Sequence, residues 1–165
     1  MRLISEALKR KEVLRMDVME LFYRYRDDVY RLAVSYTRSR QEAEDVCQTV
    51  FLKLLEQESI TPGKERAWLM QVTANECRSL LRSAWWKRTV PLDVTIPAPE
   101  PEETGVSHAI LGLKPKYRVV VYLHYYEQYT TPEIARMLKI STSAVTTRLD
   151  RARQQLRRLL KEDAQ

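Results

Sequence analysis

The spacing of apolar residues constrains the fold of this chain more than any other feature of its sequence. Apolar side chains recur every three or four positions over long stretches, as in Val18, Leu21 and Tyr25, and this period places them on one face of an α-helix. The chain has only three glycines and no Asn-Gly or Asp-Gly pair that would favour a β-hairpin. The sequence therefore predicts an all-α fold.

Three helices are expected in a first domain, residues 13–92, which follows an N-terminal extension, residues 1–12. One apolar stripe runs from Val18 to Tyr36, and a second helix begins near Arg40 and ends before Pro62. The stripe of the second helix is Ala43, Val46, Cys47, Val50, Phe51, Leu54 and Leu55. A third helix is predicted from about Glu65 to Trp86. Because 44% of the chain is apolar, these helices can bury a core without a disulfide or a metal.

Residues 93–107 differ in composition from everything around them. Three prolines alternate there with small or acidic residues, and the segment has four acidic residues and no basic one. Proline removes backbone donors, and so few apolar groups cannot offset the entropy of ordering. We expect a proline-rich acidic linker that joins two small helical domains, the second being residues 108–165. In an extended form it would reach roughly 45 Å.

The second domain shows a helix-turn-helix pattern. Thr131, Pro132 and Glu133 indicate a helix start, with a hydroxyl cap, a proline in the first turn and an acid near the positive helix end. The segment Lys139–Ser141 forms a short turn that ends on a second hydroxyl cap, and small Ala135 lets two helices cross closely. The last helix is predicted to continue to about Leu160. Helix-turn-helix units bind duplex DNA.

The last helix has two distinct faces. Val145, Leu149 and Ala152 fall on its core face, and hydroxyls and arginines fall on the other. Short hydroxyls allow close approach to the major groove, and an arginine can reach guanine O6 and N7. The residues predicted to contact bases are Ser143, Thr146, Thr147 and Arg151, and those predicted to contact phosphates are Arg136, Lys139, Arg148 and Arg153. Residues 108–165 contain eleven basic and five acidic residues. This positive net charge agrees with a nucleic-acid partner.

These residues together resemble a bacterial RNA polymerase sigma factor of the sigma-70 family, in its small extracytoplasmic-function (ECF) group. The resemblance covers about residues 13–160. It rests on the segment from Glu42 to Phe51, on Trp68-Leu69 followed by Asn75 and Arg82, and on the helix-turn-helix. These blocks are similar to region 2, to the segment that binds the minus-10 promoter element, and to region 4, which binds the minus-35 element.

The resemblance implies a role for several further residues. Glu44, Asp45 and Gln48 would contact the polymerase, although a solvated helix face would look the same in the sequence alone. The loop residues Thr61, Pro62, Gly63 and Lys64 occupy the place where the family captures a flipped base. The residues implied in minus-10 DNA binding are Asn75, Arg78, Ser79, Arg82 and Arg88; the first four share a helix face with hydrogen-bonding groups and positive charge.

Some positions depart from the family pattern. Ser79 stands where an aspartate is frequent, and Thr146 stands where a basic residue is frequent, so promoter preference is expected to be unusual. Lys139 replaces the usual turn glycine. We therefore expect a positive φ at Lys139, at a modest energetic cost.

The expected function is that of a sigma factor, which binds core RNA polymerase, recognises minus-10 and minus-35 DNA and helps to melt the promoter. The alternative is a helix-turn-helix regulator that acts without a sigma role. An enzyme is not expected, because His108 and His124 have no nucleophile, metal cluster or phosphate loop nearby. We expect no cofactor, no metal and no catalytic residue, and Cys47 and Cys77 are expected to be small buried hydrophobes.

The expected partners are core polymerase, promoter DNA and an anti-sigma factor. The first residues are charged and contain no apolar run long enough for a signal peptide or a membrane span. We therefore expect a cytoplasmic protein without membrane insertion, which an anti-sigma factor could hold at the membrane.

Overall fold

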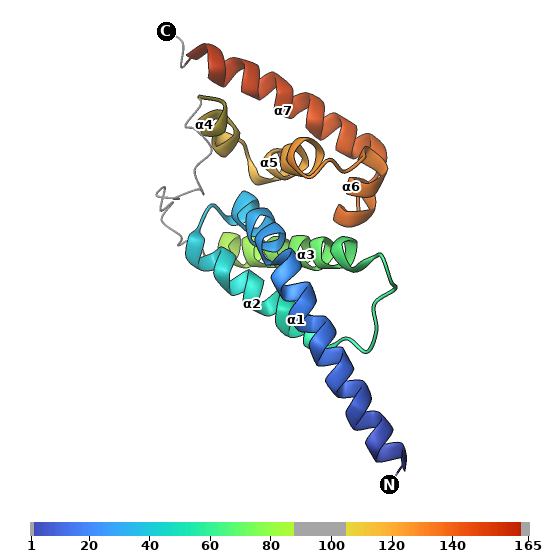
Figure 1. The fold of residues 1–165 in the computed structure, drawn as a ribbon. Coiled ribbons are helices and arrows are strands. Elements are labelled where there is room, and N and C mark those ends of the chain that lie inside the picture. Colours follow the sequence, from blue (N-terminus) through green and yellow to red (C-terminus); the bar gives the residue numbers. More distant parts are fainter. Residues whose placement is uncertain (1, 88–104, 163–165) are drawn as a thin grey trace.

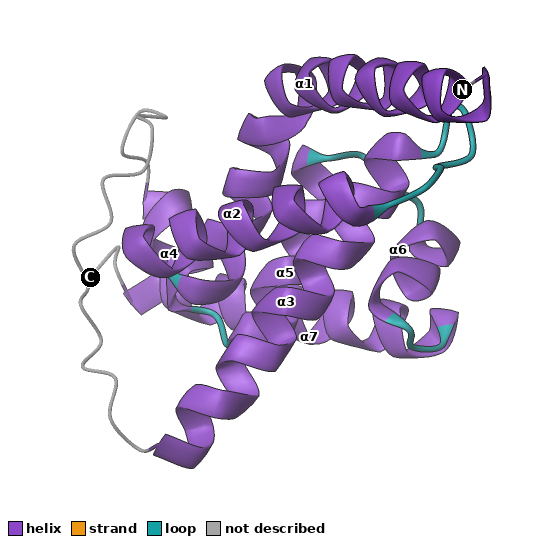
Figure 2. Ribbon diagram, turned by 90° about the horizontal axis from the view of Figure 1, so that it is seen from below, coloured by secondary structure: helices purple, strands orange, loops and turns teal. Residues whose placement is uncertain are grey.

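The computed structural model describes residues 2–87 and 105–162, and these ranges contain helices and no strand (Figure 2). The first range forms α1 (Arg2–Thr37), α2 (Arg40–Glu56) and α3 (Glu65–Lys87). The second forms α4 (Gly105–Gly112), α5 (Pro115–Val121), a π-helix η1 (Tyr122–Tyr126), α6 (Thr131–Leu138) and α7 (Thr142–Glu162). The predicted all-α fold is confirmed.

Helices α1, α2 and α3 pack around a shared apolar core. The predicted stripe of α1 is buried at its C-terminal end, where Val29, Leu32 and Ala33 are fully inaccessible, and Phe22 packs edge-on against Phe51 of α2. On α2 the prediction is wrong for Leu55, which is 55% exposed while Leu54 is 2% exposed. Leu55 lies about 100° around the helix from Leu54, which places it beyond the edge of the buried face at this end of α2.

The second group of helices differs from expectation at two places. Helix α5 begins at Pro115, because proline fits the first turn of a helix. Helix α5 continues directly into the π-helix η1, which has no counterpart in the sequence analysis. The last three residues of the predicted linker, 105–107, lie in α4; the remainder, 93–104, lies outside the described residues.

The two groups of helices lie against each other (Figure 1), with α1 contacting α5 and α3 contacting α6. One continuous cluster of buried apolar residues contains Leu32 and Tyr36 of α1 together with Val119 and Leu123 of the second group. A second, smaller cluster lies beneath α4, α5 and α7. The N-terminal part of α1 projects away from the body of the molecule (Figure 1).

Candidate nucleic-acid interface

The helix-turn-helix consists of α6, a short turn and α7. The cap of α6 lies one residue before the predicted position: Thr130 is the N-cap, and its backbone N–H and hydroxyl both donate to the Glu133 carboxylate at 2.8 Å. These bonds lower the pKa of Glu133 below its ordinary value. Lys139 has φ 54° and ψ 45°, so the expected left-handed turn residue is present. The amide of Ala144 donates to Ser141 Oγ at 3.1 Å, which is the second predicted cap.

The outward face of α7 carries the predicted base-contacting residues in an exposed position. Ser143, Thr146, Thr147 and Arg151 are all exposed, while Val145, Leu149 and Ala152 are buried on the opposite face. A recess of about 290 Å³ brings together Ser143, Thr147, Arg148 and Arg151 with two residues of α5, Lys116 and Tyr117. The Arg151 guanidinium lowers the pKa of the Tyr117 phenol. The sequence argument missed Lys116 and Tyr117 because they are distant from the turn along the chain.

The predicted phosphate-contacting residues lie in different surroundings. Arg136 and Lys139 are exposed, and Arg148 is partly buried. Arg153 already has partners within the protein: its Nε donates to the Tyr125 hydroxyl at 2.9 Å, and its guanidinium pairs with Asp150 at 2.7 Å. Of these four residues, Arg136 and Lys139 are the most accessible to a DNA backbone.

The predicted minus-10 residues lie on α3, except for Arg88, which falls outside the described residues. Ser79 and Arg82 are exposed. Arg78 is partly buried, and its guanidinium donates to Asn75 Oδ1 at 2.5 Å and to the backbone carbonyl of Leu138 at the end of α6. The structure thus brings the four α3 residues to one side of the helix, but Arg78 binds the other domain.

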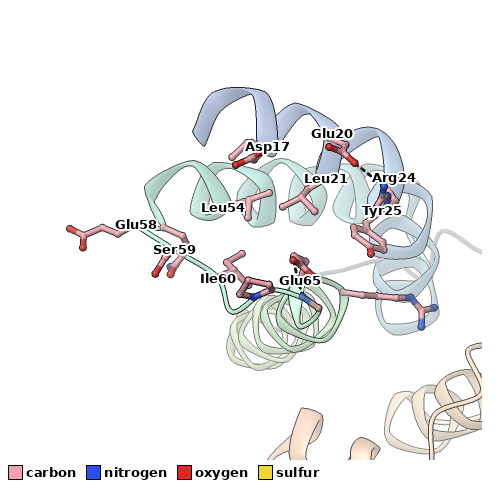
Figure 3. Close-up of a pocket in the computed structure, with 15 residues that line it drawn as sticks. Asp17, Glu20, Leu21, Arg24, Tyr25, Leu54, Glu58, Ser59, Ile60 and Glu65 are labelled. Atoms are coloured by element: carbon pink, nitrogen blue, oxygen red, sulfur yellow. Dashed lines mark hydrogen bonds and ion pairs between the residues drawn. The ribbon is translucent and has the colours of Figure 1, made fainter. Parts of the chain in front are cut away.

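A hollow of about 710 Å³ lies between α1, the end of α2 and the loop before α3. Figure 3 shows Leu21 and Tyr25 of α1 and Leu54 of α2 around it, with Ile60 of the loop facing them. Of the four predicted loop residues, Pro62 and Gly63 line this hollow and Thr61 and Lys64 do not. Carboxylates surround the apolar walls; they belong to Asp17, Glu20, Glu58 and Glu65.

Glycine is required in this loop because Gly63 has φ +78°. Its amide donates to Glu65 Oε1 at 3.0 Å, and the Lys64 amide closes the turn onto the Thr61 carbonyl at 3.0 Å. The loop is therefore held by its own hydrogen bonds against the start of α3.

The exposed face of α2 carries a stripe with both polar and apolar members. Asp45 and Gln48 are exposed, as predicted, and Leu52 and Leu55 continue their line at helical spacing with 60% and 55% of their surface exposed. Glu44 pairs with Arg40 at 3.0 Å on the neighbouring surface. We call Asp45, Gln48, Leu52 and Leu55 the α2 stripe. The spacing of three and four residues between its members could have indicated the α2 stripe from the sequence, but the sequence analysis assigned Leu55 to the core.

The remaining groups capable of site chemistry are isolated. Burial raises the pKa of the Cys47 thiol to about 12 and that of Cys77 further still, and both thiols are free. Within residues 2–87 and 105–162, no group of three His, Cys, Asp or Glu side chains is arranged to hold a metal ion. In the same part of the chain, no helix combines the length and apolar composition needed to span a bilayer.

Comparison with known proteins identifies both helical domains. The sequence model of sigma-70 region 2 matches residues 21–87, and that of sigma-70 region 4 matches residues 105–156. The ECF RNA polymerase sigma factor SigE of Mycolicibacterium smegmatis is 30% identical over 84% of this chain, which spans 59% of the SigE length. SigM of Bacillus subtilis, also an ECF sigma factor, is 28% identical over 87% of this chain and 95% of its own length.

Two solved structures share the fold. The sigma factor RpoE of Bartonella quintana, in complex with the anti-sigma factor NepR, has a TM-score of 0.75, 22% identity, and coverage of 88% of this chain and 97% of its own. CnrH, in complex with the cytosolic domain of CnrY, has a TM-score of 0.64 and 23% identity, and the match covers 95% of this chain and 96% of the CnrH chain. Since the region 2 and region 4 models together match most of the chain, the protein belongs to the sigma-70 family of RNA polymerase sigma factors, in its ECF group.

Proposed function

We propose that this sigma factor directs promoter-specific initiation by binding core RNA polymerase through α2 and promoter DNA through α3, the loop before it, and α7. The observation that carries the proposal is that the α2 stripe and the hydroxyl and arginine face of α7 are both exposed in one chain. A regulator that binds duplex DNA on its own would need only the second of these surfaces.

The α2 stripe supports a contact with polymerase. Leu52 and Leu55 are large apolar side chains that remain exposed, and two polar residues, Asp45 and Gln48, precede them on the same face. Apolar area flanked by polar groups is typical of protein–protein interfaces. Glu44 lies beside the stripe and completes the predicted set.

The hollow beside the loop supports capture of a flipped base from the minus-10 element. Tyr25 offers a stacking surface, and the apolar walls formed by Leu21 and Leu54 exclude water from a base. The carboxylates at the rim can accept hydrogen bonds from exocyclic amines. We propose that Asn75, Arg78, Ser79 and Arg82 on α3, with Arg88 beyond it, track the unpaired strand that leads to this hollow, which drives melting.

The minus-35 element is proposed to lie across the N-terminal half of α7. Ser143, Thr146, Thr147 and Arg151 face the base edges, while Arg136, Lys139, Arg148 and Arg153 face the phosphates. Lys116 lines the same recess as Arg151, and we add it to the phosphate contacts. Arg153 has to leave Asp150 and Tyr125 before it can bind DNA.

The solved relatives RpoE and CnrH were each captured with a partner, and RpoE's partner is named an anti-sigma factor. We propose that an anti-sigma factor also regulates this protein, that it acts in the cytoplasm with core polymerase, and that its regulator can hold it at the membrane. The proposed role involves no catalytic residue and no cofactor. We propose that residues 93–104, the part of the predicted linker 93–107 that precedes α4, join the domain 13–92 to the second domain.

Transcription in vitro with core polymerase tests the proposal. Asp45→Ala, Asn75→Ala and Arg151→Ala should each reduce promoter-specific initiation, and Asp27→Asn, an exposed change on α1 outside every proposed contact, should leave it unchanged. The absence of promoter-specific transcripts with the wild-type protein and its cognate core enzyme would refute the proposal. Tight sequence-specific binding of duplex DNA by the isolated protein would instead support the alternative of a simple regulator.

A further inference from the structure

The recess between α5 and α7 brings several positive charges together. Lys116, Arg148 and Arg151 line its volume of about 290 Å³, and Tyr117, Ser143 and Thr147 contribute hydroxyls to the same walls. None of the lining residues in the described part of the chain is acidic. Like charges this close repel one another, so the hydroxyl oxygens of the recess determine where each cation lies.

The ring of Tyr117 is fixed by the core beneath the recess. Its side chain is 6% exposed and belongs to the apolar cluster with Leu113, Val121 and Ala152. The Lys116 Nζ lies 5.1 Å from the centre of the ring, which is a cation–π distance. A hydrogen bond from the Arg151 guanidinium to the phenol oxygen lowers the pKa of Tyr117. One buried ring therefore contacts two of the three cations.

A second tyrosine–arginine pair on α7 provides a comparison. Arg153 donates to the Tyr125 hydroxyl at 2.9 Å and also pairs with the Asp150 carboxylate at 2.7 Å, which neutralises its charge. The recess that holds Arg151 has no acidic residue among its described lining, so Arg151 is oriented by a tyrosine while its charge remains uncompensated. A guanidinium has five N–H donors, and a bond to one phenol leaves an edge of Arg151 available for a base.

The position of Arg151 on α7 agrees with this reading. Ser143, Thr147 and Arg151 are four residues apart, so they share one side of the helix, and all three line the recess. Two hydrogen bonds to guanine O6 and N7 require the guanidinium in one orientation. An arginine that rotates freely loses side-chain entropy when it binds, whereas an arginine held in place beforehand loses less.

We propose that Tyr117 is a positioning residue for sequence recognition by α7: its hydroxyl holds the Arg151 guanidinium in the orientation that binds a guanine edge in duplex minus-35 DNA. The inference rests on the proposed function, which takes Arg151 as a base contact. Lys116 lies on the face of the same ring and contacts a phosphate, and this contact does not depend on the hydroxyl.

The test compares the base preferences of full-length variants bound to core polymerase. The probe is a pool of duplex DNA of random sequence, and the fragments that each complex retains are sequenced. Arg151→Ala should abolish the preference at one base pair, which identifies the base that Arg151 contacts. Tyr117→Phe keeps the ring and removes only the hydroxyl. It should weaken the preference at that base pair by roughly two- to tenfold, the range for immobilising one side chain, and leave the other preferences unchanged. Tyr126→Phe, which removes a hydroxyl from an exposed tyrosine of η1, is the matched control and should leave every preference unchanged.

Two further comparisons separate positioning from an electrostatic or structural role. In an Arg151→Ala background, Tyr117→Phe should have no further effect on base preference, because the side chain that it positions is absent. Tyr117→Phe removes no charge, so the salt dependence of binding should equal that of the wild type, whereas Lys116→Gln should lower it by about one counterion. Far-UV circular dichroism checks that each variant keeps its helices.

Unchanged preferences in Tyr117→Phe, an equal loss at every base pair, an effect that persists without Arg151, or a loss of helices in Tyr117→Phe would each overturn the inference. A wild-type preference that Arg151→Ala leaves intact would overturn the inference alone and leave the proposed function standing. A wild-type complex that retains no preferred sequence would refute the proposed function, and the inference with it.

Discussion

Lys139 combines a strained backbone conformation with a proposed DNA contact. Two substitutions at this residue can measure the two effects separately. It has φ 54° and ψ 45°, the left-handed conformation in which the Cβ atom lies too close to the following carbonyl oxygen. Its side chain is exposed and is proposed to contact a phosphate. We predict that Lys139→Gly stabilises the fold and weakens DNA binding at the same time.

The size of the stability effect follows from two opposing contributions. A left-handed non-glycine residue costs about 1–2 kcal/mol of strain, which glycine removes. Glycine loses more backbone entropy on folding, which offsets about 0.4–1 kcal/mol of that gain. The free energy of unfolding should therefore rise by about 0.5–1 kcal/mol. If the two domains unfold together, the melting temperature should rise by about 1–4 °C.

Thermal unfolding and promoter binding by the polymerase complex give the two readouts. Lys139→Ala is the control, because alanine removes the charge and keeps the left-handed strain. Both variants should reduce the salt dependence of binding by about one counterion, uniformly across promoter sequences, but only the glycine variant should gain stability. A glycine variant no more stable than the alanine variant would refute the assignment of strain to this turn.

Three further predictions concern other parts of the molecule. Changing Leu52 and Leu55 to serine together should lower core-polymerase affinity at least about tenfold and leave the free energy of unfolding within about 0.5 kcal/mol, because both side chains are exposed; a marked loss of stability would show that they pack within the fold. The pKa of Glu133 is lower in the folded protein than its ordinary value of 4.5. The hydrogen bonds with Thr130 therefore contribute fully to the free energy of unfolding above pH 4.5, and this contribution is lost as the pH falls through the pKa of the folded protein. Urea melts of Glu133→Gln between about pH 5 and 3 should therefore depend less on pH than those of the wild type, and equal slopes would contradict the capping role. With the pKa of Cys47 raised to about 12, this thiol should react with iodoacetamide far more slowly at pH 8 in the folded protein than after denaturation, and rapid labelling of the folded protein would show that the site opens.

The helix-turn-helix was predictable because its determinants are local. The apolar period of α7 places Val145, Leu149 and Ala152 on one face, and the structure buries all three. The Ser141 cap was expected from the hydroxyl that precedes α7, and the left-handed Lys139 was expected from the resemblance, because it replaces the glycine usual in that turn. The N-cap of α6 was placed one residue late, since Thr130 and Thr131 are both hydroxyl residues and only geometry decides which of them bonds Glu133.

Features that depend on distant contacts were not predictable. The π-helix η1 has no sequence pattern of its own; it adds a residue to the turn, and the Glu127 amide donates to the Tyr122 carbonyl at 3.1 Å. Nothing in the sequence marks Arg118 as buried, because arginine is rarely buried in full. Its partners in α1 lie more than eighty positions away in the sequence, and only the fold brings them together.

The buried charge of Arg118 also bears on how firmly the domains are held. Burial lowers the pKa of Arg118 to about 10, so the guanidinium stays charged at neutral pH and the folded protein carries the cost of removing it from water. The carbonyls of Ser35 and Tyr36 at the end of α1 accept hydrogen bonds from the guanidinium and compensate for part of that cost. A buried polar contact of this kind adds little net stability, whereas the apolar cluster that Leu32 and Tyr36 share with Val119 and Leu123 favours the packing of the two groups of helices against each other.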